Sequence, residues 1–315
     1  MRVVTSAEID QVLTFPALID ALADAFRSDM VTPIRHHHEI ERAQSHGTLL
    51  LMPAWSGAGS PDSFLGVKVV SVFPDNGAKN LPSVLGTYLL MDGTTGAPRA
   101  ALDGTRLTVW RTAAASALAA RFLAPPEAAR MVMVGSGSLA PFLIRAHMSQ
   151  RPIREVMLWN HKPEKAATLA AILRDEGLPV TATTDLEGAV RQADLVSCAT
   201  LSREPIVQGE WLEAGTHVDL VGAFNLMMRE VDDRALQRSQ VYVDTKAAKS
   251  EGGDVALALR SGAIAESAVR GDLFDLCARG PSRAPEAITL FKSVGTALED
   301  LAAAMLVWRS LPKPA

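Results

Sequence analysis

The chain has 315 residues, of which 48% are hydrophobic and 21% charged, and its formal net charge is −4. This length predicts two globular domains, and the small acidic excess without a long basic run excludes an electrostatic reason to bind nucleic acid or an anionic membrane. The only cysteines, Cys198 and Cys277, lie far apart and form neither a disulfide framework nor a metal-ligand pair. We therefore expect a small-molecule partner, no nucleic acid or membrane partner, and a reducing, cytoplasmic location.

Residues 1–118 predict an α+β unit. Thr5 and Glu8 form a capping box that opens an amphipathic helix rather than an export signal, and Pro16 opens a second helix. Three β-rich apolar runs predict strands at 47–55, 64–73 and 84–93. Residues 105–124 switch to a helical period, and this helix is expected to end at "PPEAAR".

From Met131 onward the pattern alternates between strands and helices. Strands are expected at 131–137, 154–160, 180–185, 194–200, 217–223 and 240–245, and helices at 163–177 and 186–193. This order predicts an α/β fold, a Rossmann-type doubly wound parallel sheet over residues 119–287. Because 284–308 returns to an apolar helical period, we expect residues 288–315 to complete the first domain.

The stretch "MVMVGSGSLAPF" predicts a dinucleotide site. It is an apolar strand that runs into a G-x-G-x-x-A turn and then a helix, in which glycine permits a tight turn and close approach of a pyrophosphate. The alternative is an ordinary strand-to-helix turn, but a second strand that ends about twenty residues later favours the dinucleotide. The predicted contacts are Gly135, Ser136, Gly137, Ser138, Leu139 and Ala140.

The end of the second strand indicates which dinucleotide binds. A site for NAD usually places Asp or Glu there, whereas a 2′-phosphate needs cations and polar groups. Here Asn160, His161 and Lys162 follow the strand, so we expect NADPH to be preferred, with NADH as a second cofactor. The alternative is a polar strand end whose lysine faces solvent.

Three cations of the first domain lie in otherwise apolar surroundings. Arg35 follows "TPI", Lys68 lies in "FLGVKVVSVF" and Arg111 lies in "LTVWRTAAAS". A buried charge without a partner is costly, so either an internal carboxylate or a carboxylate substrate should accompany these side chains. For any one of them, the alternative is a structural salt bridge or a side chain that extends its charged end to solvent.

Six stretches carry a family resemblance. They are "GVKVVSVFPDN", "GTYLLMDGTTGAPRAALDGTRLTVWRTAAASALAARFLA", "VGSGSLA", "HVDLVGAF", "SEGGD" and "ITLFKSVGTALEDLAAA", in this order across nearly the whole chain. Together they resemble the ornithine cyclodeaminase/mu-crystallin family. The resemblance implies a homodimer in which the α+β domain, with the C-terminal helix, provides the dimer interface and the substrate site.

The resemblance also implies roles for particular residues. Lys68 and Arg111 match the positions that bind the substrate carboxylate, and Arg35 matches a nearby arginine of the substrate site. Ser83 falls where the family's cyclodeaminases carry a substrate-binding threonine. Further cofactor contacts are implied at Thr200, Ser202, Val221, Gly222 and Val294.

Phe224 departs from the cyclodeaminase pattern. Those enzymes place an aspartate at this position to handle proton transfer with the substrate amine, and a phenyl ring can neither take a proton nor pair with an ammonium. The "VGAF…MREVDD" version instead resembles the family's ketimine reductases, which reduce Δ1-pyrroline-2-carboxylate to proline and Δ1-piperideine-2-carboxylate to pipecolate. We expect Phe224 to shape an apolar wall for a small ring; its alternative role is simple packing.

This comparison leads to a mechanistic hypothesis. The substrate carboxylate binds to Arg111 and Lys68, with Arg35 as a further anchor, and Lys68 is the best available proton donor or electrostatic partner. Alternatives that remain are an alanine-type amino-acid dehydrogenase, an ornithine cyclodeaminase and a mu-crystallin-like protein that binds NADPH and a ligand. No metal is expected, since of the consecutive His36, His37 and His38 only two share a strand face.

Overall fold

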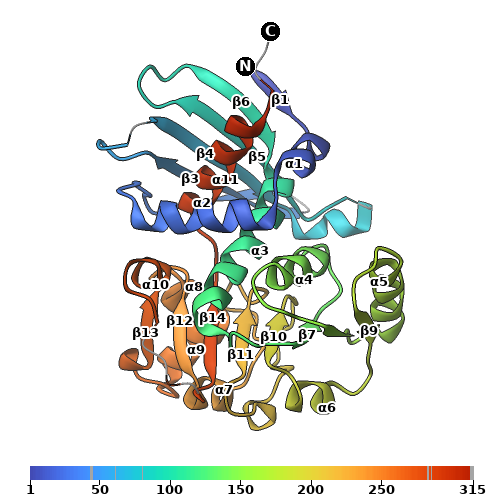
Figure 1. Ribbon diagram of the computed structural model, residues 1–315. Helices are drawn as coiled ribbons and strands as arrows, with labels where there is room; N and C mark the ends of the chain where they lie inside the picture. The colour runs from blue at the N-terminus through green and yellow to red at the C-terminus, as the bar shows by residue number, and fades with distance from the viewer. Residues whose placement is uncertain (43–44, 61, 80, 282–283, 285, 313–315) are drawn as a thin grey trace. The chain divides into compact units, whose positions relative to one another are not determined.

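The computed structural model describes residues 1–42, 45–60, 62–79, 81–281, 284 and 286–312. The chain forms two compact units, one comprising residues 1–112 and 296–315 and the other residues 113–295 (Figure 1). The sequence placed this division after residue 118 and returned the chain to the first unit at residue 288. In the structure the division falls within one helix, and residues 288–295 belong to the second unit.

The first unit is built on a six-stranded sheet with the order β1-β6-β5-β4-β3-β2. β1 pairs parallel to β6, and the other neighbours are antiparallel. The strands are β1 (Arg2–Val4), β2 (His36–Arg42), β3 (Ser45–Trp55), β4 (Phe64–Val72), β5 (Val84–Asp92) and β6 (Pro98–Asp103). Its helical elements are α1 (Ser6–Val12), α2 (Phe15–Arg27), the 3-10 turn η1 (Pro74–Lys79) and α11 (Ala297–Ser310), while α3 (Gly104–Leu123) continues into the second unit.

Local signals in the sequence account for the helix starts of this unit. The predicted capping box at α1 is confirmed, with Thr5 and Glu8 bonded to each other's backbone N–H groups, and Pro16 lies in the first turn of α2. α11 packs against α2 and against β3, β4 and β5 (Figure 1). The strand residues that face these helices are buried, so one side of the sheet forms the core of the unit.

The second unit contains an eight-stranded sheet with the order β13-β12-β14-β11-β10-β7-β8-β9, parallel throughout its described pairs. The strands are β7 (Arg130–Val134), β8 (Glu155–Trp159), β9 (Val180–Ala182), β10 (Leu195–Cys198), β11 (His217–Leu220), β12 (Gln240–Val243), β13 (Val269–Asp272) and β14 (Thr289–Lys292). The helices are α4 (Ala140–Met148), α5 (Pro163–Asp175), α6 (Leu186–Arg191), α7 (Asp233–Arg238), α8 (Ala248–Glu251), α9 (Gly253–Ser261) and α10 (Leu273–Arg279), with 3-10 turns η2 (Gly209–Trp211) and η3 (Glu266–Ala268).

This topology confirms the predicted doubly wound sheet. The strand order reverses at β7, and the carboxyl edge at such a reversal is where α/β sheets bind nucleotides. The helical pattern expected over 284–308 is wrong in its first part, because residues 289–292 form β14 between β11 and β12. A short buried apolar run does not distinguish a strand from a helix by its periodicity, and only the second part of the segment is helical.

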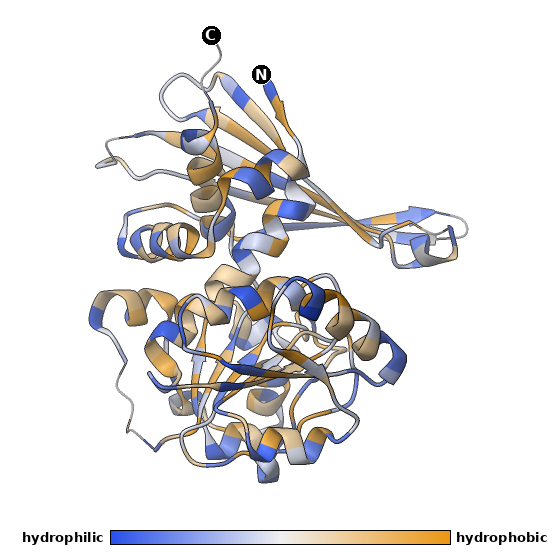
Figure 2. Cartoon of the chain, turned by 45° about the vertical axis from the view of Figure 1, so that its right-hand side comes forward, coloured by the Kyte–Doolittle hydropathy of each residue, from blue (hydrophilic) through white to orange (hydrophobic). Residues whose placement is uncertain are grey.

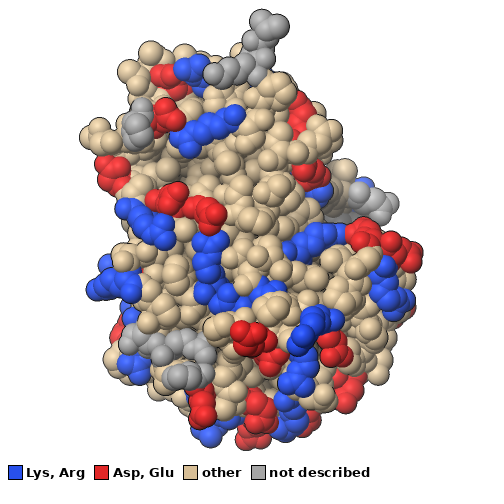
Figure 3. Space-filling model, in the orientation of Figure 1, with Lys and Arg blue, Asp and Glu red and all other residues tan. Residues whose placement is uncertain are grey.

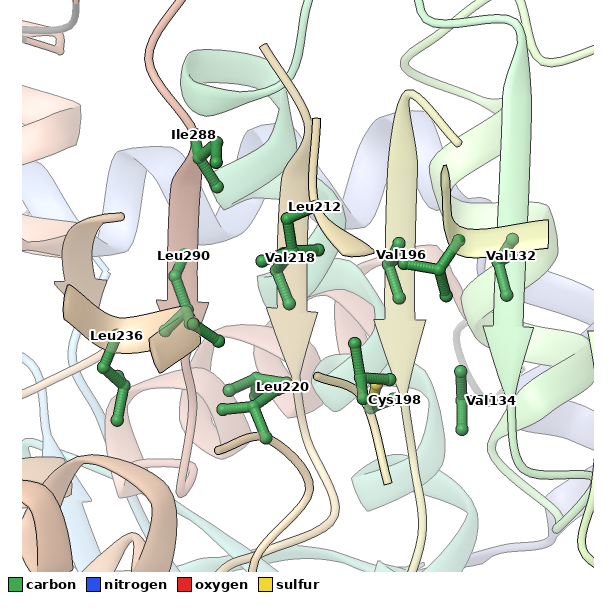
Figure 4. Close-up of a cluster of buried hydrophobic side chains, with 14 of the residues drawn as sticks. Val132, Val134, Val196, Cys198, Leu212, Val218, Leu220, Leu236, Ile288 and Leu290 are labelled. Carbon is green, nitrogen blue, oxygen red and sulfur yellow. The ribbon is translucent and has the colours of Figure 1, made fainter. Parts of the chain in front are cut away.

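Side chains from the parallel strands form the core of the second unit. Figure 4 shows Val132, Val196, Val218 and Leu290, one from each of four strands, aligned in a row. The strands of this sheet are largely hydrophobic and the outer helices carry hydrophilic faces (Figure 2).

Among the described residues, no helix is long and apolar enough to cross a membrane. The face in Figure 3 carries interspersed positive and negative side chains.

Candidate active site

The glycine turn after β7 fits the pyrophosphate of a dinucleotide. Gly135 has a φ of 110°, and a Cβ there would lie 2.6 Å from the carbonyl oxygen of Ala199. A Cβ at Gly137 would meet nothing within 4 Å, so the approach to the turn is open. Ala140 is fully buried at the start of α4, where a small side chain lets the helix pack closely on the sheet. The turn is therefore closely packed against the protein at Gly135 and Ala140 and leaves open space for a ligand at Gly137.

Asn160 links the end of β8 to the glycine turn. Its side-chain amide donates to the hydroxyl of Ser136 over 2.9 Å, and its side-chain oxygen accepts from the backbone N–H of Lys162 over 2.9 Å. His161 and Lys162 are exposed just before α5. The position that carries an acid in many NAD sites thus presents an amide and two basic side chains.

The remaining predicted cofactor residues lie at the same edge of the sheet. They follow β10, β11 and β14, at Thr200, Ser202, Val221, Gly222 and Val294. Because these strands are parallel and β11 pairs with both others, their carboxyl ends lie together. Asp244 fixes the last loop, since its Oδ2 accepts the N–H groups of Val294 and Gly295 over 2.7 and 2.6 Å.

A buried carboxylate joins two of these loops. Glu230 accepts from the backbone N–H and hydroxyl of Thr200 over 2.7 and 2.9 Å, and from the N–H groups of Gly222 and Ala223 over 2.7 and 3.2 Å. The Glu230 side chain is fully buried. The sequence analysis did not single it out, although "MREVDD" places it only six residues after Phe224.

In the first unit, the structure brings Lys68 and Arg111 together around two acids of α11. The Lys68 Nζ lies 2.8 and 2.7 Å from the two carboxylate oxygens of Asp300 and donates to Thr108 Oγ1 over 3.3 Å. Arg111 donates through Nε to Asp300 over 3.0 Å and through a terminal nitrogen to Glu299 over 2.8 Å. Both cations therefore share Asp300. The expectation that an internal carboxylate accompanies these buried cations is confirmed for Lys68 and Arg111.

Burial controls the electrostatics of this cluster. The side chains of Lys68 and Arg111 are 3% and 7% exposed, and those of Glu299 and Asp300 are 0% exposed. Burial lowers the pKa of Lys68 to about 8, although the charge of Asp300 favours the ammonium. Burial alone would raise the pKa of Asp300, but Lys68 and Arg111 outweigh that effect and hold the pKa below its usual value. Two cations and two acids meet in this cluster, so their formal charges cancel when both bases are protonated and both acids ionised.

The other predicted substrate residues occupy different surroundings. Arg35 is half-buried just before β2, and Ser83 is exposed before β5, where its hydroxyl donates to the carbonyl oxygen of Pro74 over 3.4 Å. Phe224 follows β11 and is 45% exposed. Rings of His36 and His38 lie 6.3 Å apart on one face of β2. In the part of the chain that the structure describes, no group of three or more His, Cys, Asp or Glu side chains is arranged to hold a metal.

Sequence reasoning missed the acids that complete both clusters. Glu299 and Asp300 lie in "GTALEDLAAAMLVW", an otherwise apolar helix, and two acids there were as unusual as the lysine in β4. Reading the two anomalies together would have suggested internal ion pairs. No comparable local signal marks Glu230, because its partners are mainly backbone groups that only the fold brings together.

Comparison with known proteins places this geometry in a family. The model of the ornithine cyclodeaminase/mu-crystallin family matches residues 1–313. Delta(1)-pyrroline-2-carboxylate reductase of Paracoccus denitrificans is 37% identical over 89% of this chain and 92% of its own length. Ketimine reductase mu-crystallin of Rattus norvegicus is 33% identical over 95% of this chain and 92% of its own length.

Solved structures agree with this assignment. The Thermococcus litoralis Delta(1)-pyrroline-2-carboxylate reductase in complex with NADH and L-proline superposes with a TM-score of 0.91 at 31% identity, covering 98% of this chain and 97% of the other. An archaeal alanine dehydrogenase dimer with bound NAD gives a TM-score of 0.89 at 28% identity, covering 98% and 95%. With a match across nearly its whole length, in sequence and in fold, this chain belongs to the ornithine cyclodeaminase/mu-crystallin family.

Proposed function

We propose that this chain uses NADPH to reduce cyclic ketimine carboxylates, converting Δ1-pyrroline-2-carboxylate to L-proline and Δ1-piperideine-2-carboxylate to L-pipecolate. The chain is an oxidoreductase that acts on C=N bonds with a nicotinamide cofactor, as its similarity to named reductases and to dinucleotide complexes supports. The particular substrates and the preference for NADPH are the proposal.

The loop after β11 is the observation that carries this proposal. Phe224 occupies the position where the family's cyclodeaminases carry an aspartate, and its ring is 45% exposed. The carboxylates nearest to it in sequence, Asp219 and Glu230, are fully buried. Asp219 accepts from the hydroxyl of Ser197 over 2.6 Å, and Glu230 accepts the four bonds described above. Neither is available as a base for a substrate amine, whereas reduction of a ketimine does not need one.

The Lys68–Arg111 cluster suits a ketimine carboxylate. A protonated cyclic ketimine carries one positive and one negative charge, so its binding leaves the formally neutral cluster neutral. The substrate carboxylate is held by Arg111 and Lys68, with Arg35 as a further anchor and Ser83 and Phe224 as the remaining substrate contacts. When bound, the reduced dinucleotide supplies a hydride to C2 of the ring. Because the bound iminium already carries the proton on its nitrogen, hydride addition gives the neutral amine and the oxidised cofactor. Lys68 then donates a proton to that amine, which gives the ammonium form of the product.

The cofactor preference rests on the end of β8. Asn160, His161 and Lys162 place no acid where a ribose 2′-phosphate would lie, and both basic side chains are exposed. NADPH is therefore expected to bind more tightly than NADH, and fluorescence titration of each gives the two dissociation constants. An equal or reversed order of affinity contradicts this part of the proposal. The loop residues Gly135 to Ala140, with Thr200, Ser202, Val221, Gly222 and Val294, complete the proposed cofactor contacts.

A homodimer is the proposed assembly. The face of the six-stranded sheet opposite α11 is hollowed, and its lining mixes apolar side chains, among them Val3, Val69, Leu85 and Ala101, with serine, threonine and aspartate side chains. Val3 and Leu85 are 70% and 44% exposed, and a second copy that packs on this face would remove both from water. The dimeric alanine dehydrogenase with a similar fold supports a dimeric assembly.

A substrate panel tests the reaction. The purified protein is offered NADPH with each of the two cyclic ketimines, NADPH with pyruvate and ammonia, and ornithine with NAD⁺. We expect NADPH consumption with the ketimines and no ammonia release from ornithine. Robust ammonia release would show that the proton acceptor lies elsewhere and that the chain is a cyclodeaminase. Turnover confined to pyruvate and ammonia would identify an alanine-type dehydrogenase, and tight NADPH binding without any turnover a ligand-binding protein.

A further inference from the structure

Glu230 is a fully buried acid that the proposed reaction does not use. We propose that Glu230 is a positioning residue, which fixes the nicotinamide end of the cofactor site by holding the loops after β10 and β11 in one arrangement. The inference rests on the proposed dinucleotide binding, and it assigns a role to a residue that touches neither substrate nor cofactor in the proposed mechanism.

The bonds to Glu230 match the capacity of an ionised carboxylate. Its Oε1 accepts the N–H and the hydroxyl of Thr200, and its Oε2 accepts the N–H groups of Gly222 and Ala223. A carboxylate offers about four lone-pair positions, two on each oxygen, and all four are used. Two donors come from each loop in turn, so the side chain joins the ends of two neighbouring parallel strands.

The two loops touch closely at this point. A Cβ on Gly222 would lie 2.0 Å from the carbonyl oxygen of Thr200 and 2.5 Å from Glu230 Oε1. Residue 222 must therefore be glycine for both loops to reach the same carboxylate. Thr200 and Gly222 are also two of the proposed cofactor contacts, so the positions of their backbone atoms decide the shape of that site.

A second buried pair holds Glu230 from behind. The backbone N–H groups of Glu230 and Val231 donate to Asp254 Oδ1 over 2.7 and 3.1 Å. The other oxygen of Asp254 lies 3.3 Å from Lys292 Nζ, and both side chains are 0% exposed. Lys292 is the last residue of β14, so the network spans the ends of three adjacent strands. Because Asp254 restrains the backbone of Glu230, its side chain keeps one direction.

The charges around Glu230 make this device sensitive to pH. Asp254 faces it from α9, Lys292 from β14 and the Cys198 thiol from β10. Burial raises the pKa of Glu230 to about 7. The loss of hydration and the negative charge of Asp254 both favour the protonated acid, and together they outweigh the attraction of Lys292 for the carboxylate. Protonation turns one oxygen into a donor that faces N–H or O–H donors, and at least one bond to a loop is lost. Cofactor affinity should therefore fall as the pH drops through about 7.

Fluorescence titration of NADH binding between pH 6 and 8 tests the inference. NADH is the probe because its phosphates do not titrate in this range, whereas the 2′-phosphate of NADPH does. The variants are Glu230→Gln, which keeps the shape but loses the charge, and Glu204→Gln, which removes an exposed carboxylate from the loop after β10. At pH 8 we expect the dissociation constant of Glu230→Gln to rise at least about tenfold, as for lost bonds to a charged group. Its affinity should also lose the pH dependence of the wild type, and Glu204→Gln should match the wild type in both respects.

The outcomes distinguish a failure of dinucleotide binding from a failure of the role of Glu230. If the wild type binds no dinucleotide at any pH, the cofactor assignment fails and the inference fails with it. If the wild type binds NADH and Glu230→Gln binds it equally well, or with the same pH dependence, the inference alone is overturned. A lower melting temperature with unchanged affinity indicates a purely structural role and also overturns it. Should Glu230→Gln not fold, the wild-type titration decides: weaker binding below about pH 7 supports the role of Glu230, and a flat profile refutes it.

Discussion

Asp300→Asn is the substitution that tests the ionic cluster most directly. Asparagine keeps the volume of the side chain but removes the charge that Lys68 and Arg111 share at 2.7–3.0 Å. Glu299 continues to pair with Arg111 over 2.8 Å, whereas the ion pair of Lys68 with Asp300 at 2.7 Å is lost. The perturbation therefore falls mainly on the protonation of one amine.

The magnitude follows from proton linkage. Lys68 has a pKa of about 8 in the folded protein and 10.5 when free, so its protonated form persists at pH 7 at a cost to stability. Without Asp300 the pKa of Lys68 falls further. Once this pKa is below 7, Lys68 is neutral at pH 7, and a further fall adds nothing to the loss of stability at that pH. One unit of pKa corresponds to about 1.4 kcal/mol, which limits the contribution of Lys68 at pH 7 to roughly that value. Loss of the charged hydrogen bond from Arg111 to residue 300 costs about 1.5–3 kcal/mol more. We therefore expect the free energy of unfolding to fall by about 3–4 kcal/mol in total.

Two assays read this change. Urea unfolding at pH 7 gives the loss of stability, and the pH dependence of kcat/KM for Δ1-pyrroline-2-carboxylate reports the protonation of Lys68. The wild type should lose activity as the pH rises through about 8, and Asp300→Asn should move this limb below pH 7. Glu299→Gln is the matched control, because Glu299 contributes less to the pKa of Lys68 than Asp300 does.

The result that refutes the reasoning is equally definite. If Asp300→Asn is folded and its alkaline limb stays with that of the wild type, Asp300 does not set the protonation of Lys68. A larger shift of the alkaline limb in Glu299→Gln than in Asp300→Asn would show that Glu299, and not Asp300, sets the protonation of Lys68. Titration of the substrate nitrogen is common to all three proteins, so it cannot produce a difference between them.

Three further predictions concern other parts of the molecule. Lys68→Arg should lower kcat/KM, because arginine does not release a proton, and should remove the alkaline limb near pH 8, because arginine stays protonated there; a limb that persists in this variant belongs to the substrate or another group. Gly135→Ala should raise the dissociation constant of NADH at least about tenfold in fluorescence titrations, since a Cβ would lie 2.6 Å from the Ala199 carbonyl oxygen at a φ of 110°; unchanged binding would mean that the turn is not the pyrophosphate site. Leu85→Arg should yield monomers in sedimentation velocity. Ile172→Arg, at a similarly exposed apolar position on α5, should leave the dimer intact, and dimers in both variants would place the interface elsewhere.

Local patterns in the sequence were sufficient for much of the fold. The capping box of α1, the proline in the first turn of α2, and the strands β7 to β12 each depend on residues close together in the chain, and the structure has them where the sequence predicts. The same holds for the glycine turn, because a strand, the five-residue turn "GSGSL" and a helix follow one another directly. Phe224 was informative for a similar reason, since the family motif around it is continuous.

Only the tertiary structure decided how the charged residues pair and where the last strand lies. Residues 289–292 have an apolar pattern compatible with either a helix or a strand, and the gap between β11 and β12 in the parallel sheet makes them a strand. Lys68 and Asp300 are 232 residues apart, and Glu230 is bonded chiefly to backbone groups that any sequence would offer. A sequence shows which buried charges need partners, because burial without a partner is costly, but the choice among distant acids depends on which surfaces the packed sheet and helices bring into contact.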